Sequence, residues 1–119
     1  KQGTVSACHD ISDGGILIAI AEMALASVKD ATFLGVKITN PTNIPDHAFF
    51  FGEEQSRYIL TSQDANSILE IAKRHNVTAK ILGKTTKHQE LTIDKIGNIS
   101  LQRCFEINER WLPEYMKTA

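Results

Sequence analysis

The sequence predicts an α/β or α+β fold, in which helices pack on a β-sheet. Three observations lead to this prediction: segments with strand-like alternation recur along the chain, two helical segments lie between them, and a hairpin pattern stands near the end. With 119 residues the chain is long enough to bury a core of its own, so we expect one domain over residues 1–119.

The first half is expected to begin with a short strand over residues 4–9, followed by a turn and a helix over 15–27. Within residues 16–26 that helix carries a single charge, Glu22, and is apolar on nearly every side. A helix of this kind must be covered on both sides, by a third layer or by a partner domain.

A second strand is expected over 31–39, where the dipeptide Asn40-Pro41 stops it. The connection over 41–54 is long for a loop, so we expect a short helix inside it. The aromatic cluster 49–51 in this connection is interpreted as core or interface, because the interleaved basic residues of a nucleic-acid surface are missing.

The second half is expected to continue with a strand over 56–61 and an amphipathic helix over 65–75 that Asp64 caps. The pattern then predicts a strand over 77–83, a hairpin of 90–93 with 98–101, and a short terminal helix over 106–115 that Pro113 interrupts. Trp111, Pro113 and Tyr115 are interpreted as a tail that binds another surface.

The charge balance argues against nucleic acid and anionic membrane as partners, because 13 Lys and Arg stand against 14 Asp and Glu. Cys8 and Cys104 lack the spacing of a metal site, and we expect reduced thiols. With no apolar run of membrane-spanning length, a cytoplasmic location is expected. Since the chain starts at Lys1 without a methionine, we expect a piece of a longer polypeptide.

The most informative motif is the run from His9 to Gly15, which leads directly into the apolar helix. Two glycines at a helix start leave backbone N–H groups uncovered, and these donors form a natural anion site, for example for a phosphate. The glycines serve equally well in a tight strand-to-helix turn. Asp10 and Asp13 would repel a bare phosphate, so we expect them to cap amides, orient donors or hold Mg²⁺, with capping expected of Asp13.

A second polar cluster over residues 51–57 places two carboxylates, an amide, a hydroxyl and Arg57 at the entrance to a strand. In one interpretation, Arg57 forms a bidentate pair with a carboxylate or phosphate while Glu53 or Gln55 holds a neighbouring group. In the other, the segment is a solvated loop with an ordinary salt bridge. His9 is interpreted as a hydrogen-bonded structural residue before an acid or base.

Together the run from Cys8 to Ile16, the sequence Ala21-Glu22-Met23, and the cluster 51–57 resemble one family. They are similar to the C-terminal domain in the second half of the phosphoribosylformylglycinamidine synthases, synthetase subunits of the aminoimidazole ribonucleotide synthetase-related superfamily. The resemblance spans essentially the whole chain. It implies a three-layer α/β/α sandwich with a mixed sheet, partly like a ferredoxin fold.

The resemblance also implies a function in de novo purine biosynthesis. In this family an ATP-dependent ligase phosphorylates the amide oxygen of formylglycinamide ribonucleotide, and ammonia derived from glutamine displaces phosphate to give the amidine. ATP and Mg²⁺ are the expected cofactors of the full enzyme. The expected partners are the N-terminal domains of the same polypeptide, a glutamine amidotransferase subunit and a small accessory subunit.

By the same resemblance, two groups of residues line the cleft shared with an N-terminal domain. The phosphate-facing group is His9, Asp10, Ser12, Asp13, Gly14 and Gly15, and the inter-domain group is Glu53, Gln55, Ser56 and Arg57. No catalytic residue is expected in this chain, which should be inactive alone, because the family's catalytic histidine and most ATP and Mg²⁺ ligands lie in its N-terminal domains. Glu54 departs from the serine of the family pattern.

Two alternatives remain open at this point. The chain is expected either to border a productive ligase site or to act as a structural domain that packs beside a non-catalytic nucleotide site. The equivalent domain of another member of the superfamily fits the same pattern, and a free-standing phosphate-ester binding protein is a further reading.

Overall fold

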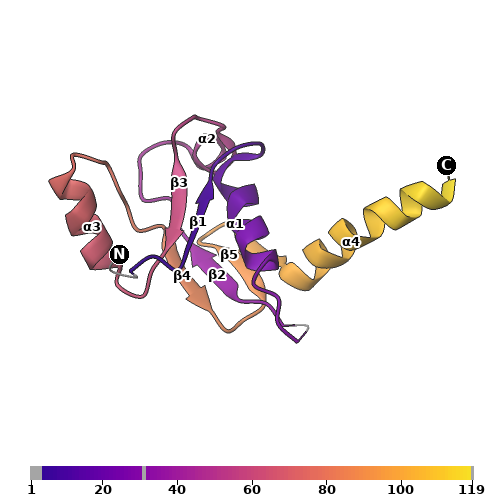
Figure 1. Cartoon of the computed structure of the whole chain (residues 1–119). Coiled ribbons are helices and arrows are strands. Elements are labelled where there is room, and N and C mark those ends of the chain that lie inside the picture. The colour runs from indigo at the N-terminus through magenta and orange to yellow at the C-terminus, as the bar shows by residue number, and fades with distance from the viewer. Residues whose placement is uncertain (1–3, 31, 119) are drawn as a thin grey trace. The chain divides into compact units, whose positions relative to one another are not determined.

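A computed structural model describes residues 4–30 and 32–118 (Figure 1). Over these residues the elements in chain order are β1 (Ala7–Asp10), α1 (Gly15–Leu25), β2 (Gly35–Ile38), α2 (Asp46–Phe51), β3 (Tyr58–Thr61), α3 (Ala65–Arg74), β4 (Gly83–Thr86), β5 (Glu90–Ile93), β6 (Gly97–Ser100) and α4 (Leu101–Thr118). None of the helices described combines the length and the apolar character of a membrane span.

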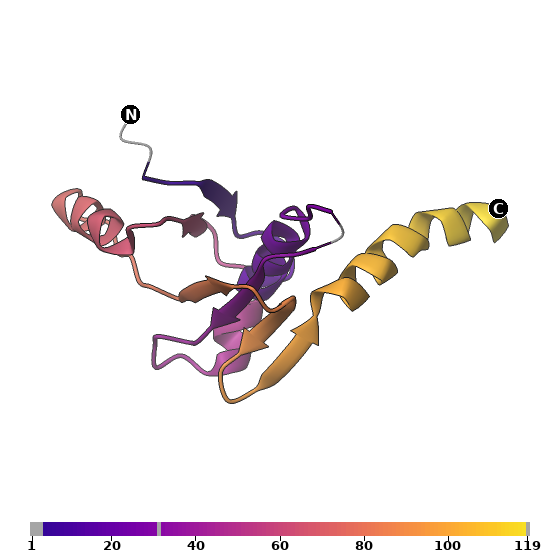
Figure 2. The ribbon, with the colours of Figure 1, turned by 90° about the horizontal axis from the view of Figure 1, so that it is seen from below.

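The strands form two sheets. In the first, β1 pairs with β3 in antiparallel fashion. In the second, the order is β4-β2-β5-β6, and β2 runs antiparallel to β4 but parallel to β5, while β5 and β6 form an antiparallel hairpin (Figure 2). The predicted α/β (α+β) class with a mixed sheet is confirmed.

The chain groups into two compact units. Unit 1 runs to Ile20 and resumes over Asn40–Leu82, so it contains β1, the start of α1, α2, β3 and α3. Unit 2 consists of Ala21–Thr39 and the chain from Gly83 onwards, with the end of α1, β2, β4, β5, β6 and α4. The single domain expected over residues 1–119 stays a prediction.

In unit 1 the core consists of apolar side chains from the β1–α1 turn, α1, α2 and β3. These are Ile11, Ile16, Leu17, Ala19, Ile20, Phe49, Phe50 and Ile59. The rings of Phe49 and Phe50 meet edge to face, with centroids 5.1 Å apart. The prediction that the aromatic cluster is core is confirmed for these two rings, whereas Phe51 is exposed.

Helix α1 is buried over most of its circumference, as its apolar composition predicts. Ile18 and Glu22, one turn apart on the same side, are exposed. The prediction that helix α1 is covered on both sides is therefore confirmed except at Ile18 and Glu22.

Helix α3 begins and ends with recognisable caps. The carboxylate of Asp64 accepts a hydrogen bond from the N–H of Ser67 at 3.1 Å, which confirms the predicted cap. At the other end Asn76 has a positive φ of 56°, and the N–H of Val77 donates to the carbonyl of Ala72 at 2.8 Å. This pattern is a Schellman motif, in which asparagine replaces the usual glycine.

The core of unit 2 comes from the end of α1, the segment before β2, strands β2 and β5, and the first turn of α4. It consists of Ala24, Phe33, Ile38, Leu91, Ile93 and Leu101. Phe105 on α4 packs its ring against Phe33, with centroids 5.4 Å apart. The predicted hairpin is confirmed, although its second strand ends one residue early, at Ser100.

Two predicted elements differ from the structure. The strand expected over 77–83 is wrong, because pairing begins only at Gly83 and the exposed Val77 and Ile81 form no buried face. The terminal helix starts at Leu101 and continues through Pro113, so the predicted interruption is also wrong. Its early start has a local cause, because the hydroxyl of Ser100 accepts a hydrogen bond from the N–H of Arg103 at 3.2 Å and caps the helix.

The remaining strands are shorter than predicted. The first strand spans Ala7–Asp10 in place of 4–9, and the third spans Tyr58–Thr61 in place of 56–61. The strand expected over 31–39 is reduced to Gly35–Ile38, and Ala31 lies outside the described residues, as do residues 1–3.

Candidate functional site

The two motifs meet because β1 and β3 pair. The register places Asp10, the last residue of β1, opposite Tyr58, the first residue of β3. One step beyond the ladder, the N–H of Ile11 donates to the carbonyl of Arg57 at 2.9 Å. An antiparallel pair therefore brings the turn after β1 beside the loop before β3, although about forty residues separate them in the sequence.

The two loops line a recess of about 340 Å³ within unit 1. Most of the predicted site residues contribute to its wall, namely Asp10, Ser12, Asp13, Glu53, Gln55, Ser56 and Arg57. Ile11 and Tyr58 line it as well, and the sequence reasoning missed both. The position of Tyr58 at the recess follows from its pairing with Asp10, and this register cannot be derived from the sequence alone.

The remaining predicted residues, His9, Gly14 and Gly15, are not among those that line the recess. The ring Nδ1 of His9 is hydrogen-bonded to the carbonyl oxygen of Asp10, as expected of a structural histidine, and lies 3.8 Å from a carboxylate oxygen of Asp10. Gly15 is buried, and a Cβ atom placed there would lie 2.7 Å from the carbonyl oxygen of Phe50. Because Gly15 also has a φ of +72°, this position requires glycine for packing as well as for conformation.

The start of α1 is already bound by a carboxylate of the protein. The N–H of Gly14 donates to Oε1 of Glu53 at 2.8 Å, and the N–H of Gly15 donates to the carbonyl of Ser12 at 3.1 Å. Glu53 thus satisfies an N–H group that the sequence predicted to bind a phosphate. The prediction that Asp13 caps the helix is wrong. The exposed Asp13 side chain makes no hydrogen bond among the described residues, and Glu53 binds the N–H of Gly14 in its place.

Arg57 is held by its own loop. Its Nη2 donates to the carbonyl of Gly52, and its Nε lies 3.5 Å from Oε2 of the exposed Glu54. The Nε atom is buried and has no hydrogen-bond partner among the described residues. The bidentate pair with a carboxylate is therefore absent from the described contacts of Arg57, and a weak, exposed ion pair replaces it.

Backbone strain marks the same loop. Ser56, which lines the recess, has a φ of +64°, a left-handed conformation that side chains other than glycine, asparagine and aspartate rarely adopt. Strain of this kind costs on the order of 1–3 kcal/mol and concentrates where a loop is held in one geometry for binding or catalysis.

The electrostatics of the recess disfavour a free anion. Three carboxylates, those of Asp10, Asp13 and Glu53, line it against the single guanidinium of Arg57. At an effective dielectric constant of about 20, two like charges about 6 Å apart repel by roughly 3 kcal/mol. A phosphate in this recess would need a cation supplied with it.

The described residues do not form a metal site of their own. No three His, Cys, Asp or Glu side chains within residues 4–30 and 32–118 lie close enough to hold a metal ion. The side chains that line the recess are carboxylates, hydroxyls, an amide, a phenol, an aliphatic group and one guanidinium.

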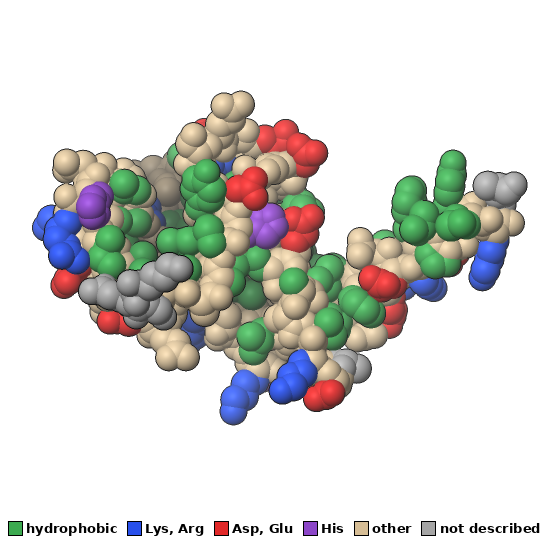
Figure 3. All heavy atoms as spheres, in the orientation of Figure 1, with side chains coloured by type: hydrophobic (Ala, Val, Ile, Leu, Met, Phe, Trp, Pro, Cys, Tyr) green, Lys and Arg blue, Asp and Glu red, His purple; other side chains and the backbone are tan. Residues whose placement is uncertain are grey.

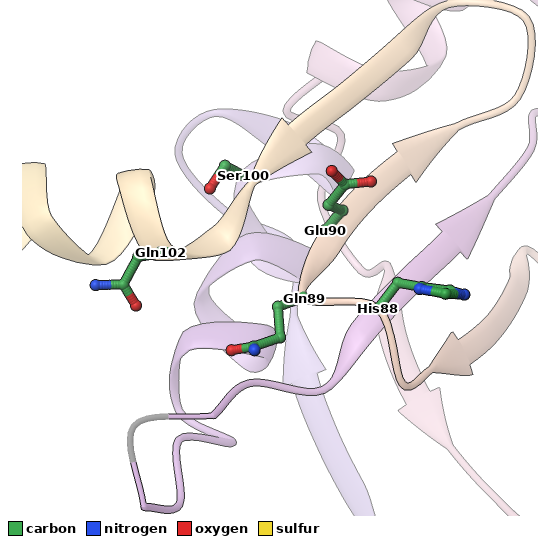
Figure 4. Close-up of a pocket in the computed structure, with 5 residues that line it drawn as sticks. All are labelled: His88, Gln89, Glu90, Ser100 and Gln102. Carbon is green, nitrogen blue, oxygen red and sulfur yellow. The ribbon is translucent and has the colours of Figure 1, made fainter.

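A second recess, of about 420 Å³, lies in unit 2 between the start of β5, the end of β6 and the first turn of α4. Figure 4 shows its five lining residues, His88, Gln89, Glu90, Ser100 and Gln102, with side chains that diverge. The side chain of Gln89 is already used, because its Oε1 accepts a hydrogen bond from the N–H of Phe33 at 3.1 Å. Diverging groups do not make a binding site, so the recess of unit 1 is the better candidate.

The chain is similar to one protein family over most of its length. The profile of the family described as AIR synthase related protein, C-terminal domain, matches residues 1–96. The chain is 37% identical over 114 residues to phosphoribosylformylglycinamidine synthase subunit PurL of Gluconobacter oxydans, an alignment that covers 96% of this chain and 15% of that protein. It is 40% identical over 121 residues to the PurL subunit of Methylocella silvestris, which covers 100% of this chain and 16% of that protein.

The PurL subunit of Parvibaculum lavamentivorans is 41% identical over 118 residues, covering 98% of this chain and 15% of that protein. The chain thus spans about 15% of the length of the curated relatives that it matches.

Proposed function

Because this chain belongs to the AIR synthase related protein C-terminal domain family, as its motifs predicted, we propose that it is the C-terminal domain of a phosphoribosylformylglycinamidine synthase subunit. In this proposal it is one part of a longer polypeptide. The similarity to the PurL subunits over 96–100% of the chain carries the proposal.

The proposed reaction is the ATP-dependent conversion of formylglycinamide ribonucleotide to its amidine with ammonia derived from glutamine. An amide carbonyl is a poor electrophile, and the amide oxygen becomes a leaving group only when it is activated. ATP supplies this activation by phosphorylating the oxygen, so that ammonia can displace phosphate.

This chain contributes one wall of the site in our proposal and does not hold Mg-ATP by itself. Two observations support this division: Glu53 occupies the N–H of Gly14, and three carboxylates line the recess against one guanidinium. The N-terminal part of the polypeptide would then supply the cations and the catalytic groups. The side chains of Gln55 and Ser56 make no hydrogen bond among the described residues and remain available at the recess to orient a bound ligand, whereas the hydroxyl of Ser12 donates to Oδ2 of Asp10 at 2.9 Å.

The variant Asp13→Ala tests this proposal in the longer polypeptide. Asp13 lines the recess, is exposed, and makes no hydrogen bond among the described residues, so its loss should leave the unfolding midpoint unchanged. If the recess faces the ligand, kcat/KM of amidine formation should fall at least about tenfold, which corresponds to about 1.4 kcal/mol. Steady-state kinetics and thermal unfolding of the same preparation measure both quantities.

Glu70→Ala is the matched control, because it removes an exposed carboxylate from α3, outside the recess. It should change neither kinetics nor stability. Asp13→Ala with wild-type kinetics would contradict a role of the recess in ligand contact.

A second candidate function is purely structural. The contact between Gly14 and Glu53 and the tight packing of Gly15 on Phe50 favour it, because both serve the fold without any ligand. In this case Asp13→Ala is silent and substitutions at Gly15 act through folding alone.

A further inference from the structure

Helix α4 packs on its own unit only through its first turns. Leu101 is fully buried and Phe105 contacts Phe33, but every residue from Glu106 to Lys117 is exposed. Figures 1 and 2 show α4 leaving the end of β6 and running away from the sheet of unit 2. About twelve residues of helix are thus without tertiary cover in the described chain, and helices of this length are marginal in water on their own.

The exposed part of α4 is strongly amphipathic. Its outer apolar face consists of Ile107, Trp111, Leu112, Tyr115 and Met116, all of which are more than half exposed. Figure 3 shows hydrophobic side chains gathered along the outer part of this helix. At 3.6 residues per turn these positions share one half of the helix with Leu101 and Phe105, so the face continues the surface by which α4 packs on its own unit.

The chemistry of this face is that of a protein interface. The rings of Trp111 and Tyr115 are stacked, with centroids 5.7 Å apart and planes 9° apart, and form one flat aromatic surface. Trp, Tyr and Met are the residues enriched in interfaces, and burying them contributes most to association. An extended apolar surface of this kind on a soluble protein marks a contact site.

The charges on the opposite half argue against a membrane. Basic Arg103, Arg110 and Lys117 are balanced there by acidic Glu106, Glu109 and Glu114. Arg103 pairs with Glu106 and Arg110 with Glu114, each at 3.8 Å. A helix that lies on an anionic bilayer carries an excess of Lys and Arg on its polar half, which α4 lacks.

The size of the face argues against a second copy of this chain. Twelve residues of helix are about 18 Å long and about 10 Å wide. A contact between two such faces falls below the roughly 1,200–2,000 Å² that a stable complex of separate chains buries. Contacts within one polypeptide need less area, because the covalent connection raises the effective concentration.

The comparisons point to the same kind of partner. The family profile ends at residue 96, before β6 and α4, whereas the similarity to the PurL subunits covers up to 100% of this chain. The terminal helix therefore belongs to the sequence shared with these long proteins, and about 85% of their length lies outside the segment matched here. A surface shared with the long relatives but outside the family profile fits a partner that the long polypeptide itself provides.

We propose that the outer apolar face of α4 docks onto the larger remaining part of the same polypeptide and fastens this domain to it. This inference rests on the proposed function only in assuming the longer polypeptide. It assigns to α4 an intramolecular docking role that is separate from the recess of unit 1.

Hydrogen–deuterium exchange of residues 106–117 tests the proposal in two proteins, this chain and the longer polypeptide. In this chain these amides should exchange at nearly the rate of an unfolded peptide. In the longer polypeptide they should exchange at least about tenfold more slowly. Equal exchange in both proteins would overturn the proposal, and so would protection in this chain that increases with its concentration, which would indicate a second copy.

A pair of double variants of the longer polypeptide makes the test specific. Trp111→Ser with Met116→Ser should return the exchange of α4 to the rate in this chain, whereas Glu109→Ser with Lys117→Ser, on the polar half, should keep the protection. The control pair loses at least as much helix propensity as the test pair, because Glu, Lys and Met are all stronger helix formers than Ser, whereas Trp ranks with Ser. Loss of protection in both would overturn the proposal. Amidine formation by the wild-type polypeptide is measured separately, so a failure of the proposed function is distinguished from a failure of the docking contact.

Discussion

At the scale of single residues, the glycine turn and the polar loop support each other. Gly14 and Gly15 allow the chain to turn from β1 into α1, and Glu53 then binds the N–H of Gly14 from across the β1–β3 pair. Sequence reasoning identified both groups of residues, because glycines and clustered polar side chains are visible in the sequence. It did not find that the two groups satisfy each other, since this depends on the register of two strands about fifty residues apart.

Gly15→Ala measures how much the turn depends on this glycine. The new Cβ atom would lie 2.7–2.8 Å from backbone atoms of Phe50 and Phe51, and φ is +72°. The free energy of unfolding should therefore fall by about 3 kcal/mol or more. Urea unfolding gives this value directly.

Gly97→Ala is the matched control, because Gly97 also has a positive φ, of 155°, but a Cβ atom there would have no neighbour within 4 Å. It should cost about 1 kcal/mol. Equal losses at Gly15 and Gly97 would contradict the close packing of the turn on α2.

Substitutions at Glu53 separate the hydrogen bond from the charge. Glu53→Ala removes the acceptor of the Gly14 N–H and should destabilise the chain by about 1–2 kcal/mol. Glu53→Gln keeps an acceptor oxygen and should lose only the interaction with the helix dipole, about 0.3–1 kcal/mol. Chemical denaturation of the two variants tests the order, and a larger loss for glutamine than for alanine would show that Glu53 does not cap α1.

At the scale of elements, local signals predicted what local interactions determine. The Asp64 cap, the apolar first helix, the helix within the long connection and the β5–β6 hairpin follow from capping, periodicity and turn residues. The strand expected over 77–83 fails, because β-propensity indicates an extended backbone and not a partner strand. Helix α4 starts early because Ser100, which the alternating pattern assigns to the strand, also caps the helix that follows it.

The cap of α4 is tested by Ser100→Ala. Loss of the hydrogen bond to the N–H of Arg103 should destabilise the first turn of α4 by about 1 kcal/mol. Exchange of the amides of residues 102–104 should accelerate accordingly in mass spectrometry. Asn98→Ala, two residues earlier in the exposed strand, serves as the control and should leave these amides unchanged.

At the scale of the whole molecule, the comparisons show the family that the sequence motifs predicted, and we propose that this chain holds only part of a site. The recess of unit 1 has the polar groups of a ligand contact, but its carboxylates outnumber its one guanidinium, and the exposed half of α4 lacks cover within the described chain. The sequence indicated both properties in part, through the acidic residues Asp10 and Asp13 and through the apolar tail around Trp111, but which side chains are bound or buried follows only from the structure. Both are expected of a domain that completes its surfaces against the rest of a longer polypeptide.

Titration calorimetry of this chain with Mg-ATP tests most directly whether it supplies one wall of a shared site. We predict no heat of binding up to about 1 mM nucleotide, equivalent to a binding free energy weaker than about −4 kcal/mol, while circular dichroism shows a folded chain. A dissociation constant in the micromolar range that Asp13→Ala weakens would contradict the proposal, because the recess of unit 1 would then be a nucleotide site complete in itself.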